Sequence, residues 1–286
     1  MSSRPLAYLL LAPATLLIGC VFLVPFILLL VMGFWTQKPG SLLLDTQLTL
    51  INYQRIFGDN LYLRGLLTTL WLSAATTLIC LAIALPVAYF MVKKAGRARG
   101  LLMALMLIPL VSGALLPTLG LVNLLSTLGV VNGALKALGL IDKSISFLGN
   151  STGILIGLVQ SFLPLAVLPL VTVLDRLPAD YEDAAMSLGA SRRNVWRRVL
   201  LPLSMPGLLA GALLVFCAAL TSFVTPQILG QGKVATFSTM AFQQASLVLD
   251  WPFASALAVV MLAILALIAL AASLAQKRMA HRRAVA

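Results

Sequence analysis

The sequence consists mostly of long apolar runs separated by short polar segments. Six runs reach the length of about 20 residues that crosses a bilayer, and they cover residues 6–34, 63–92, 101–122, 153–174, 203–225 and 253–275. No charged residue lies well inside any run, and Arg64 stands at the edge of the second. Inside lipid every backbone polar group must be paired within its own element, so these runs predict helices. The sequence therefore predicts an all-α polytopic membrane protein, with residues 1–286 as a single transmembrane domain.

The longest well-patterned polar segment, residues 178–202, predicts a helix–turn–helix. One small apolar face recurs at helical spacing and consists of Tyr181, Ala184, Ala185 and Leu188. Acidic residues at 180, 182 and 183 stand where the dipole of the first helix favours negative charge. Gly189 can take the left-handed conformation that ends a helix, and Ser191 can cap the second helix. Periodicity alone also fits a surface helix that rests on lipid headgroups.

The charged residues are few and unevenly distributed. The chain is 61% hydrophobic and 10% charged, with a net charge of +12. With the N-terminus placed in the cytoplasm, 14 of the 20 Lys and Arg residues fall in inner segments and six in outer segments. This positive-inside bias places both termini and residues 178–202 in the cytoplasm. The basic excess is thus a topology signal and a contact with anionic lipid, rather than a nucleic-acid site.

A few polar side chains interrupt the apolar runs. The candidates for lining a solute pathway are Thr69, Ser73, Thr76, Gln160 and Thr221. Small hydroxyl residues and amides also serve as hydrogen-bonding contacts between tightly packed membrane helices, so packing remains open beside pathway lining. Pro109 and Pro117 interrupt the third run, and such helices are tolerated where they line a cavity or pack on neighbours.

No motif in the sequence indicates an enzyme. The chain lacks a GxxxxGK[ST] phosphate loop, an HExxH motif and a GxSxG motif, so we expect no catalytic residue. Cys20, Cys80 and Cys217 lie in apolar runs, where thiols behave as small hydrophobes. We expect no metal site and no cofactor. A secondary transporter or channel subunit without an ATPase partner is an alternative, but ion coupling usually requires ionisable groups at mid-membrane. A scaffold for another membrane complex is a third possibility.

One motif separates these functions. An acidic-Ala-Ala triplet at Asp183-Ala184-Ala185 is followed after three residues by Gly189, and after nine more by Val199-Leu200-Leu201-Pro202. This pattern resembles the EAA loop of the permease subunits of type I ABC importers, with Asp183 where the family usually has Glu. The stretches Leu125–Asn132 and Trp251-Pro252-Phe253 resemble segments of the spermidine/putrescine-type members. The resemblance extends from about Asn52 to Phe253.

The resemblance implies the function and the partners. A permease of this family forms half of the pathway in a bacterial inner membrane and pairs with a second homologous permease or with itself. Two ATPase subunits hydrolyse ATP beneath it, and a periplasmic binding protein delivers the solute. The motif residues Asp183, Ala184, Ala185, Leu188, Gly189 and Pro202 are then the ATPase-coupling site. The implied solute is a polyamine or a related amine or amino-acid-derived compound, although the apolar runs contain no Asp or Glu.

Overall fold

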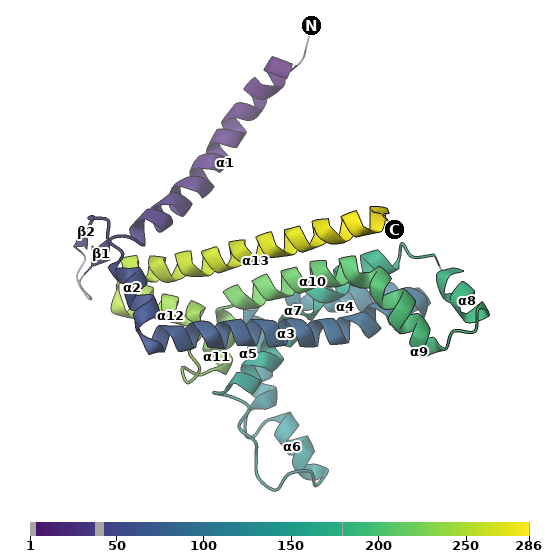
Figure 1. The fold of residues 1–286 in the computed structure, drawn as a ribbon. Coiled ribbons are helices and arrows are strands. Elements are labelled where there is room, and N and C mark those ends of the chain that lie inside the picture. Colours follow the sequence, from purple (N-terminus) through teal and green to yellow (C-terminus); the bar gives the residue numbers. More distant parts are fainter. Residues whose placement is uncertain (1–3, 38–42, 179, 286) are drawn as a thin grey trace. The chain divides into compact units, whose positions relative to one another are not determined.

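The computed structural model of the protein describes residues 4–37, 43–178 and 180–285, most of them helical (Figure 1). Within these residues, six helical segments are long and apolar enough to cross a membrane. The expected all-α polytopic fold is confirmed. The chain divides into two compact units, of which the first comprises residues 1–64 and 240–263 and the second comprises residues 65–239 and 264–286.

The first unit contains the N-terminal helix, a pair of short strands and several short helical segments. Its elements are α1 (Arg4–Met32), β1 (Thr36–Gln37), β2 (Leu44–Asp45), α2 (Ile51–Gly58), the start of α3 (Asn60–Lys93), the π-helix η3 (Gln244–Val248) and the start of α13 (Trp251–Val285). The strands pair antiparallel, with Thr36 opposite Asp45. The side chain of Asn52 on α2 donates to the carbonyls of Gly33 (3.1 Å) and Trp35 (2.7 Å), which anchors the chain after α1.

A buried charge organises the start of α13. Asp250 is 3% exposed, and its Oδ1 accepts a hydrogen bond from the backbone N–H of Phe253 (3.2 Å), so it caps the helix. Its Oδ2 lies 3.4 Å from Nη1 of Arg55, whose guanidinium lies 4.1 Å from the centre of the Phe253 ring. Burial raises the pKa of Asp250, and the N–H of Phe253 and the Arg55 charge oppose the shift.

The second unit is a packed helical bundle. Its elements are the rest of α3, the 3-10 turn η1 (Gly96–Ala98), α4 (Arg99–Val111), α5 (Leu115–Leu125), α6 (Val130–Ala137), α7 (Ser151–Leu174), α8 (Asp180–Ser187), α9 (Arg192–Val195), the π-helix η2 (Trp196–Leu200), α10 (Leu201–Thr221), α11 (Val224–Leu229) and the start of α12 (Phe237–Gln243). In this unit α7 packs along α10 and also contacts α4, α5 and α11.

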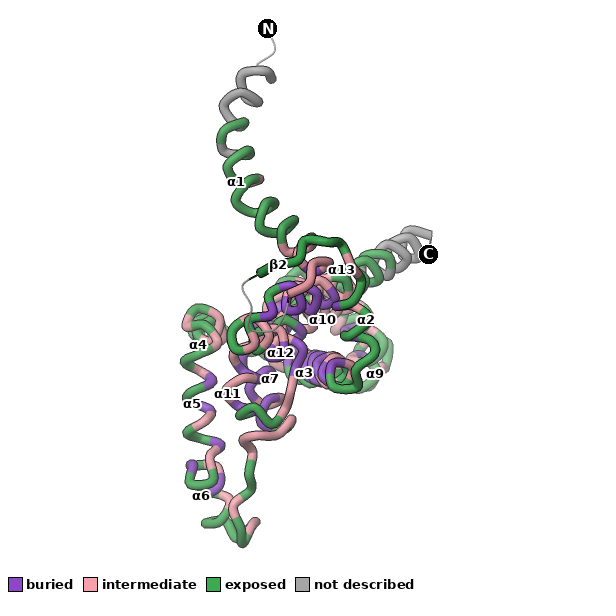
Figure 2. Tube along the Cα trace, turned by 90° about the vertical axis from the view of Figure 1, so that its left-hand side faces the viewer, coloured by how far each residue is buried: buried purple, intermediate pink, exposed green. Residues whose placement is uncertain are grey.

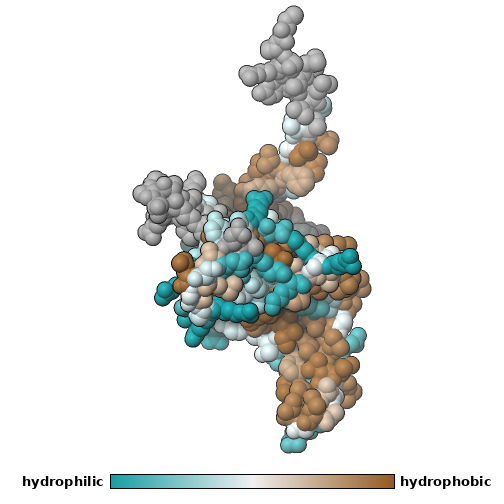
Figure 3. Space-filling view, turned by 90° about the vertical axis from the view of Figure 1, so that its right-hand side faces the viewer, coloured by the Kyte–Doolittle hydropathy of each residue, from teal (hydrophilic) through white to brown (hydrophobic). Residues whose placement is uncertain are grey.

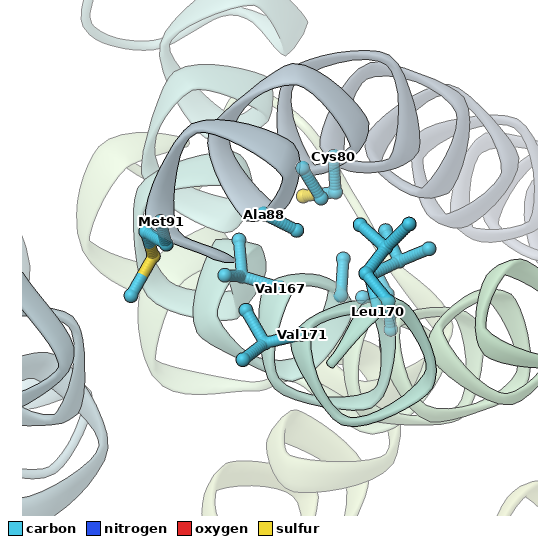
Figure 4. Packing of buried hydrophobic residues seen from close by; sticks show 10 residues of the cluster. Cys80, Ala88, Met91, Val167, Leu170 and Val171 are labelled. Atoms are coloured by element: carbon cyan, nitrogen blue, oxygen red, sulfur yellow. The ribbon is translucent and has the colours of Figure 1, made fainter. Parts of the chain in front are cut away.

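The core of the second unit lies between α3 and α7. Cys80, Ala88 and Met91 of α3 pack against Val167 and Leu170 of α7 in one buried cluster (Figure 4). Figure 2 shows buried residues along both helices. Glycines of α10 allow its backbone to approach that of α7 closely. A Cβ atom at Gly211 would lie 3.2 Å from the Cα of Ala166, tighter than ordinary packing. This close approach of small residues is typical of membrane helix pairs.

All six expected spans begin within three residues of the start of an observed helix. Two of them do not continue as one helix to their expected ends. Residues 101–122 do not form one helix, because α4 ends at Val111 and α5 begins at Leu115, with Gly113 between them at φ +72°. Pro117 has no N–H to bond the carbonyl of Gly113, which removes a hydrogen bond that would join the two helices. The expected span 203–225 ends as a helix at Thr221, and α11 follows as a separate element.

Candidate functional site

The predicted helix–turn–helix is present in the described part of residues 178–202, with α8 (Asp180–Ser187) and α9 (Arg192–Val195) as its helices. Helix α8 ends in a Schellman turn, in which Gly189 N–H donates to the carbonyl of Met186 (2.9 Å) and Ala190 N–H to that of Ala185 (3.1 Å). Gly189 has φ +82°, the left-handed conformation expected for it. The side chain of Ser191 accepts a hydrogen bond from the N–H of Asn194 and caps α9, also as expected. Pro178 lies two residues before α8.

The second half of this loop continues into the membrane without a break. Helix α9 leads through η2 directly into α10, so residues Arg192–Thr221 form one helical run. Pro202 lies at the start of α10 and cannot donate to the carbonyl of Arg198 in an α-helical pattern. The π-helical turn η2 ends at Leu200, just before Pro202. Its hydrogen bonds span five residues, as in the bond from the N–H of Leu201 to the carbonyl of Trp196. Pro202 therefore lies on a different element from the other motif residues.

The apolar face of α8 is not buried by the rest of the chain. Tyr181 is 52% exposed and Leu188 is 90% exposed, while Asp183 and Ala184 are also exposed and Ala185 is half-buried. Exposed arginines at 192, 193, 197 and 198 follow on α9 and η2. Figure 3 shows the hydrophilic side chains gathered on the face that carries α8 and α9. The face of α8 is small and apolar, with acidic residues at the helix start and basic residues nearby. Such a surface is better suited to binding a protein partner than to remaining uncovered.

Glu182, one residue before the motif, joins α8 to α3. Its Oε2 accepts a hydrogen bond of 2.9 Å from the hydroxyl of Tyr89, and its Oε1 lies 3.1 Å from Nζ of Lys93. The ring of Tyr89 also packs on the ring of Trp196, with centroids 4.7 Å apart. Sequence reasoning missed these four residues. The available signal was the spacing of Tyr89 and Lys93, which places them one turn apart at the end of the second run.

A second ion pair lies at the same end of the unit. Nη1 of Arg99, at the start of α4, lies 2.8 Å from Oδ1 of Asp175, which follows α7. The hydrogen bond from Arg99 lowers the pKa of Asp175. Both side chains are partly exposed to solvent, so we expect the pair to contribute little to stability.

The pathway candidates fall into two groups. Thr69, Ser73 and Thr76 on α3 are buried within the chain, at 3%, 0% and 0% exposure. Thr69 and Ser73 donate to the carbonyls four residues before them, those of Gly65 and Thr69. By contrast, Gln160 on α7 and Thr221 on α10 are exposed. The structure therefore does not bring the five residues to one surface, and their role in a pathway stays a prediction.

Comparisons with known proteins bear on these features. A family model described as the binding-protein-dependent transport system inner membrane component matches residues 84–285. The spermidine/putrescine transport system permease protein PotB of Escherichia coli (strain K12) is 34% identical over 250 residues, which are 87% of this chain and 90% of that protein.

Two crystal structures share the fold. One is a bacterial ABC transporter involved in the import of the acidic polysaccharide alginate, with a TM-score of 0.77, 18% identity and coverage of 96% of this chain and 95% of that chain. The other is the bacterial alginate ABC transporter in complex with an alginate pentasaccharide-bound periplasmic protein, with a TM-score of 0.76, 18% identity and coverage of 96% and 94%.

Proposed function

The chain belongs to the family of binding-protein-dependent transport system inner membrane components, the permease subunits of ABC importers, and we propose that it forms half of the translocation pathway of an ATP-driven importer. The observation that carries this proposal is the exposed face of α8 within an intact family motif. The residues that would dock into an ATPase are Asp183, Ala184, Ala185, Leu188 and Gly189, with Pro202 at the start of α10 completing the motif. In this proposal residues 1–286 are one permease domain and residues 178–202 are its coupling loop.

The proposed assembly contains several chains. Two copies of a cytoplasmic ATP-binding subunit would hydrolyse ATP, and a second permease, homologous or identical, would supply the other half of the pathway. A periplasmic binding protein would deliver the solute, and the alginate transporter of the same fold is described in complex with a pentasaccharide-bound periplasmic protein. The basic residues of the loop favour a cytoplasmic position for α8, and both termini would then lie on the same side. The chain itself would not be an enzyme.

The proposed solute is a polyamine or a related amine. The support is the 34% identity to PotB, which is named for spermidine and putrescine. The alginate transporters share the fold at 18% identity, which carries no argument about the solute. A polycation would require acidic or aromatic groups, and the apolar runs of this chain contain no Asp or Glu. We therefore place the selection of the solute chiefly in the binding protein and the second permease.

The test of the coupling site is the replacement of Gly189 by Val. No atom lies within 4 Å of a Cβ built at Gly189, so the substitution acts through the backbone. A β-branched residue at φ +82° should be strained by about 1–2 kcal/mol and should misplace α9 relative to α8. We expect the six spans to insert normally and the ATPase to be lost on co-purification.

Substitutions at Asp183 test the same site through charge. Asp183→Glu should have a mild effect on co-purification of the ATPase, whereas Asp183→Lys should have a severe effect because it reverses the interaction with the helix dipole.

The matched control is Gly232→Val. Gly232 has φ +71° and also has open space around its Cβ position, but it lies outside the coupling loop. Its replacement applies the same backbone strain elsewhere, so the ATPase should still co-purify with that variant. If Gly189→Val retains the ATPase and transport-coupled ATP hydrolysis at the wild-type level, the loop is a lipid-surface helix and the proposed coupling site is wrong.

A further inference from the structure

The coupling loop is tied to a membrane span through one side chain of α8. Apart from Glu182, the motif-bearing residues from Tyr181 to Leu188 are exposed or half-buried, and α8 packs against α9 and η2 of its own loop. In the part of the chain that the structure describes, Glu182 makes the recorded side-chain contacts from α8 to α3, through Tyr89 and Lys93. Its side chain is only 16% exposed. Glu182 therefore points inward, while Asp183 beside it is exposed.

Tyr89 receives both halves of the loop. Its hydroxyl donates to Glu182 of α8, and its ring packs on Trp196 of η2 at an interplanar angle of 56°. Because η2 is continuous with α10, this one tyrosine on α3 contacts both α8 and the start of a second span. A pocket of about 410 Å³ opens beside these contacts and is lined by Tyr89, Glu182, Met186 and Trp196 among others. Open space on this side leaves α8 room to change position while the two contacts hold.

The helix behind Tyr89 is packed well enough to carry a displacement. Ala84, Ala88 and Met91 are at most 1% exposed and lie in the cluster with α7. One face of α3 further along carries Thr69, Ser73 and Thr76. A close-packed interior moves as a unit rather than deforming gradually. A displacement of the end of α3 near Tyr89 would therefore be transmitted to the segment of α3 that carries Thr69, Ser73 and Thr76.

From these contacts we infer that Glu182, Tyr89 and Lys93 form a transmission joint, which passes movement of α8 to α3, and that Glu182 is a positioning residue distinct from the ATPase-docking face at Asp183. The inference rests on the proposed function. In this inference the two groups of residues have different roles. Asp183 and its neighbours bind the ATPase, and Glu182 connects the bound α8 to α3. A docking variant should lose the ATPase, whereas a joint variant should keep it and lose the response.

The experiment uses the full permease–ATPase complex in lipid nanodiscs. Hydrogen exchange of the backbone amides 69–88 is compared without nucleotide and after trapping with Mg-ATP and vanadate. In the Tyr89→Phe/Glu182→Ala double variant, the ATP-dependent change in exchange rate should fall by about tenfold or more, because the variant loses both the charge-assisted hydrogen bond to Tyr89 and the ion pair with Lys93. Co-purification of the ATPase should stay within about twofold of wild type, because the docking face is unchanged.

Two further variants separate a joint from simple packing. Tyr89→Phe alone keeps the ring contact with Trp196 and removes only a half-buried hydroxyl, so its melting temperature should fall by no more than the loss of one hydrogen bond implies, while its exchange response weakens. The charge-swapped pair Lys93→Glu/Glu182→Lys should recover most of the response that Glu182→Lys alone loses, because it restores an ion pair. The melting temperature of each variant is measured beside the response, because a role in packing alone would lower both together.

Each outcome decides the matter. If the double variant shows the wild-type response, or if it loses the ATPase as Asp183→Lys does, Glu182 is not a joint and the inference is overturned while the proposed function stands. If the wild-type permease does not retain any ATPase, the proposed function itself fails. A preserved ATPase with a lost response, rescued by the charge swap, supports the inference.

Discussion

The hydroxyl of Thr69 accepts a hydrogen bond of 2.8 Å from the backbone N–H of Phe237, 168 residues later in the chain. Thr69 thereby caps the first turn of α12, whose early N–H groups have no partner within the helix. Its hydroxyl also donates to the carbonyl of Gly65 (2.7 Å), so it satisfies two backbone groups at once. A residue that the sequence marks as a pathway candidate thus joins α3 to α12.

Replacement of Thr69 by Val should destabilise the permease. Valine preserves the shape and removes the acceptor for Phe237, which should cost about 1–2 kcal/mol and lower the melting temperature in detergent. Thr69→Ser keeps the hydroxyl and should stay near wild type. If Thr69→Val melts like wild type but loses uptake, the residue acts in the pathway and not in packing.

Bulky apolar residues at Gln160 and Thr221 should affect transport rather than folding. Both side chains are exposed on this chain, so Gln160→Leu and Thr221→Leu leave its core intact. We expect uptake of radiolabelled spermidine or putrescine per membrane-inserted permease to fall several-fold, by about 1 kcal/mol or more in the transport step. Uptake that falls only in step with the amount of protein would assign both residues to packing.

The close approach of α10 to α7 predicts that Gly211→Ala is destabilising. The added methyl group would meet the Cα and carbonyl oxygen of Ala166, each at 3.2 Å, and neither backbone atom can turn aside. Overpacking of this kind costs about 1–3 kcal/mol. Gly120→Ala on α5 is the matched control, since no atom lies within 4 Å of its Cβ position. Thermal unfolding should distinguish the two variants, and equal melting temperatures would contradict the packing argument.

The buried Asp250 predicts a pH dependence of stability. Its folded-state pKa lies above the ordinary value of 3.8, chiefly because of burial. Between these two values the folded protein holds a proton that the unfolded protein has released, so stability should fall as pH rises through this window and then stay level. Asp250→Asn keeps an oxygen that can cap α13 and should remove the slope, whereas Asp250→Ala should also lose the cap, at a cost of about 1 kcal/mol. Melting curves from pH 3.8 upward measure both effects.

The orientation of the chain can be tested by cysteine labelling. In a background with the three native cysteines replaced by alanine, Leu140→Cys should react with an impermeant maleimide added to intact cells, because the 14-to-six distribution of basic residues places it outside. Leu140 is 67% exposed and accessible to the reagent. Ala190→Cys should react only in inverted vesicles. External labelling of position 190 in intact cells would reverse the proposed orientation.

Turns and helix caps, which depend on neighbouring residues, could be predicted from the sequence. Contacts between helices that are distant in the sequence could not. The left-handed turn at Gly189 and the cap at Ser191 follow from residue type and spacing. The role of Glu182 does not, because periodicity shows which residues share a face but not which face meets another helix. Likewise, the small residues Ser112, Gly113 and Ala114 interrupt the apolar run only briefly, so hydropathy alone does not reveal the break between α4 and α5. Hydroxyl groups bonded to their own backbone have the same sequence signature as hydroxyl groups that line a cavity.

The π-helical turn η2, residues Trp196–Leu200, sets the rotational phase between the loop and the membrane. Each residue of an α-helix advances the chain by about 100°, so one deletion within this turn would rotate α10 against α9 by that angle. Either Trp196 would turn away from Tyr89 while Thr221 kept its orientation, or Thr221 would rotate while Trp196 kept its contact with Tyr89. Insertions and deletions of single residues are usually tolerated between elements, yet here they would misalign two faces 25 residues apart. Over evolutionary time, length variation should therefore be restricted in this turn even where the identity of its residues is free to change.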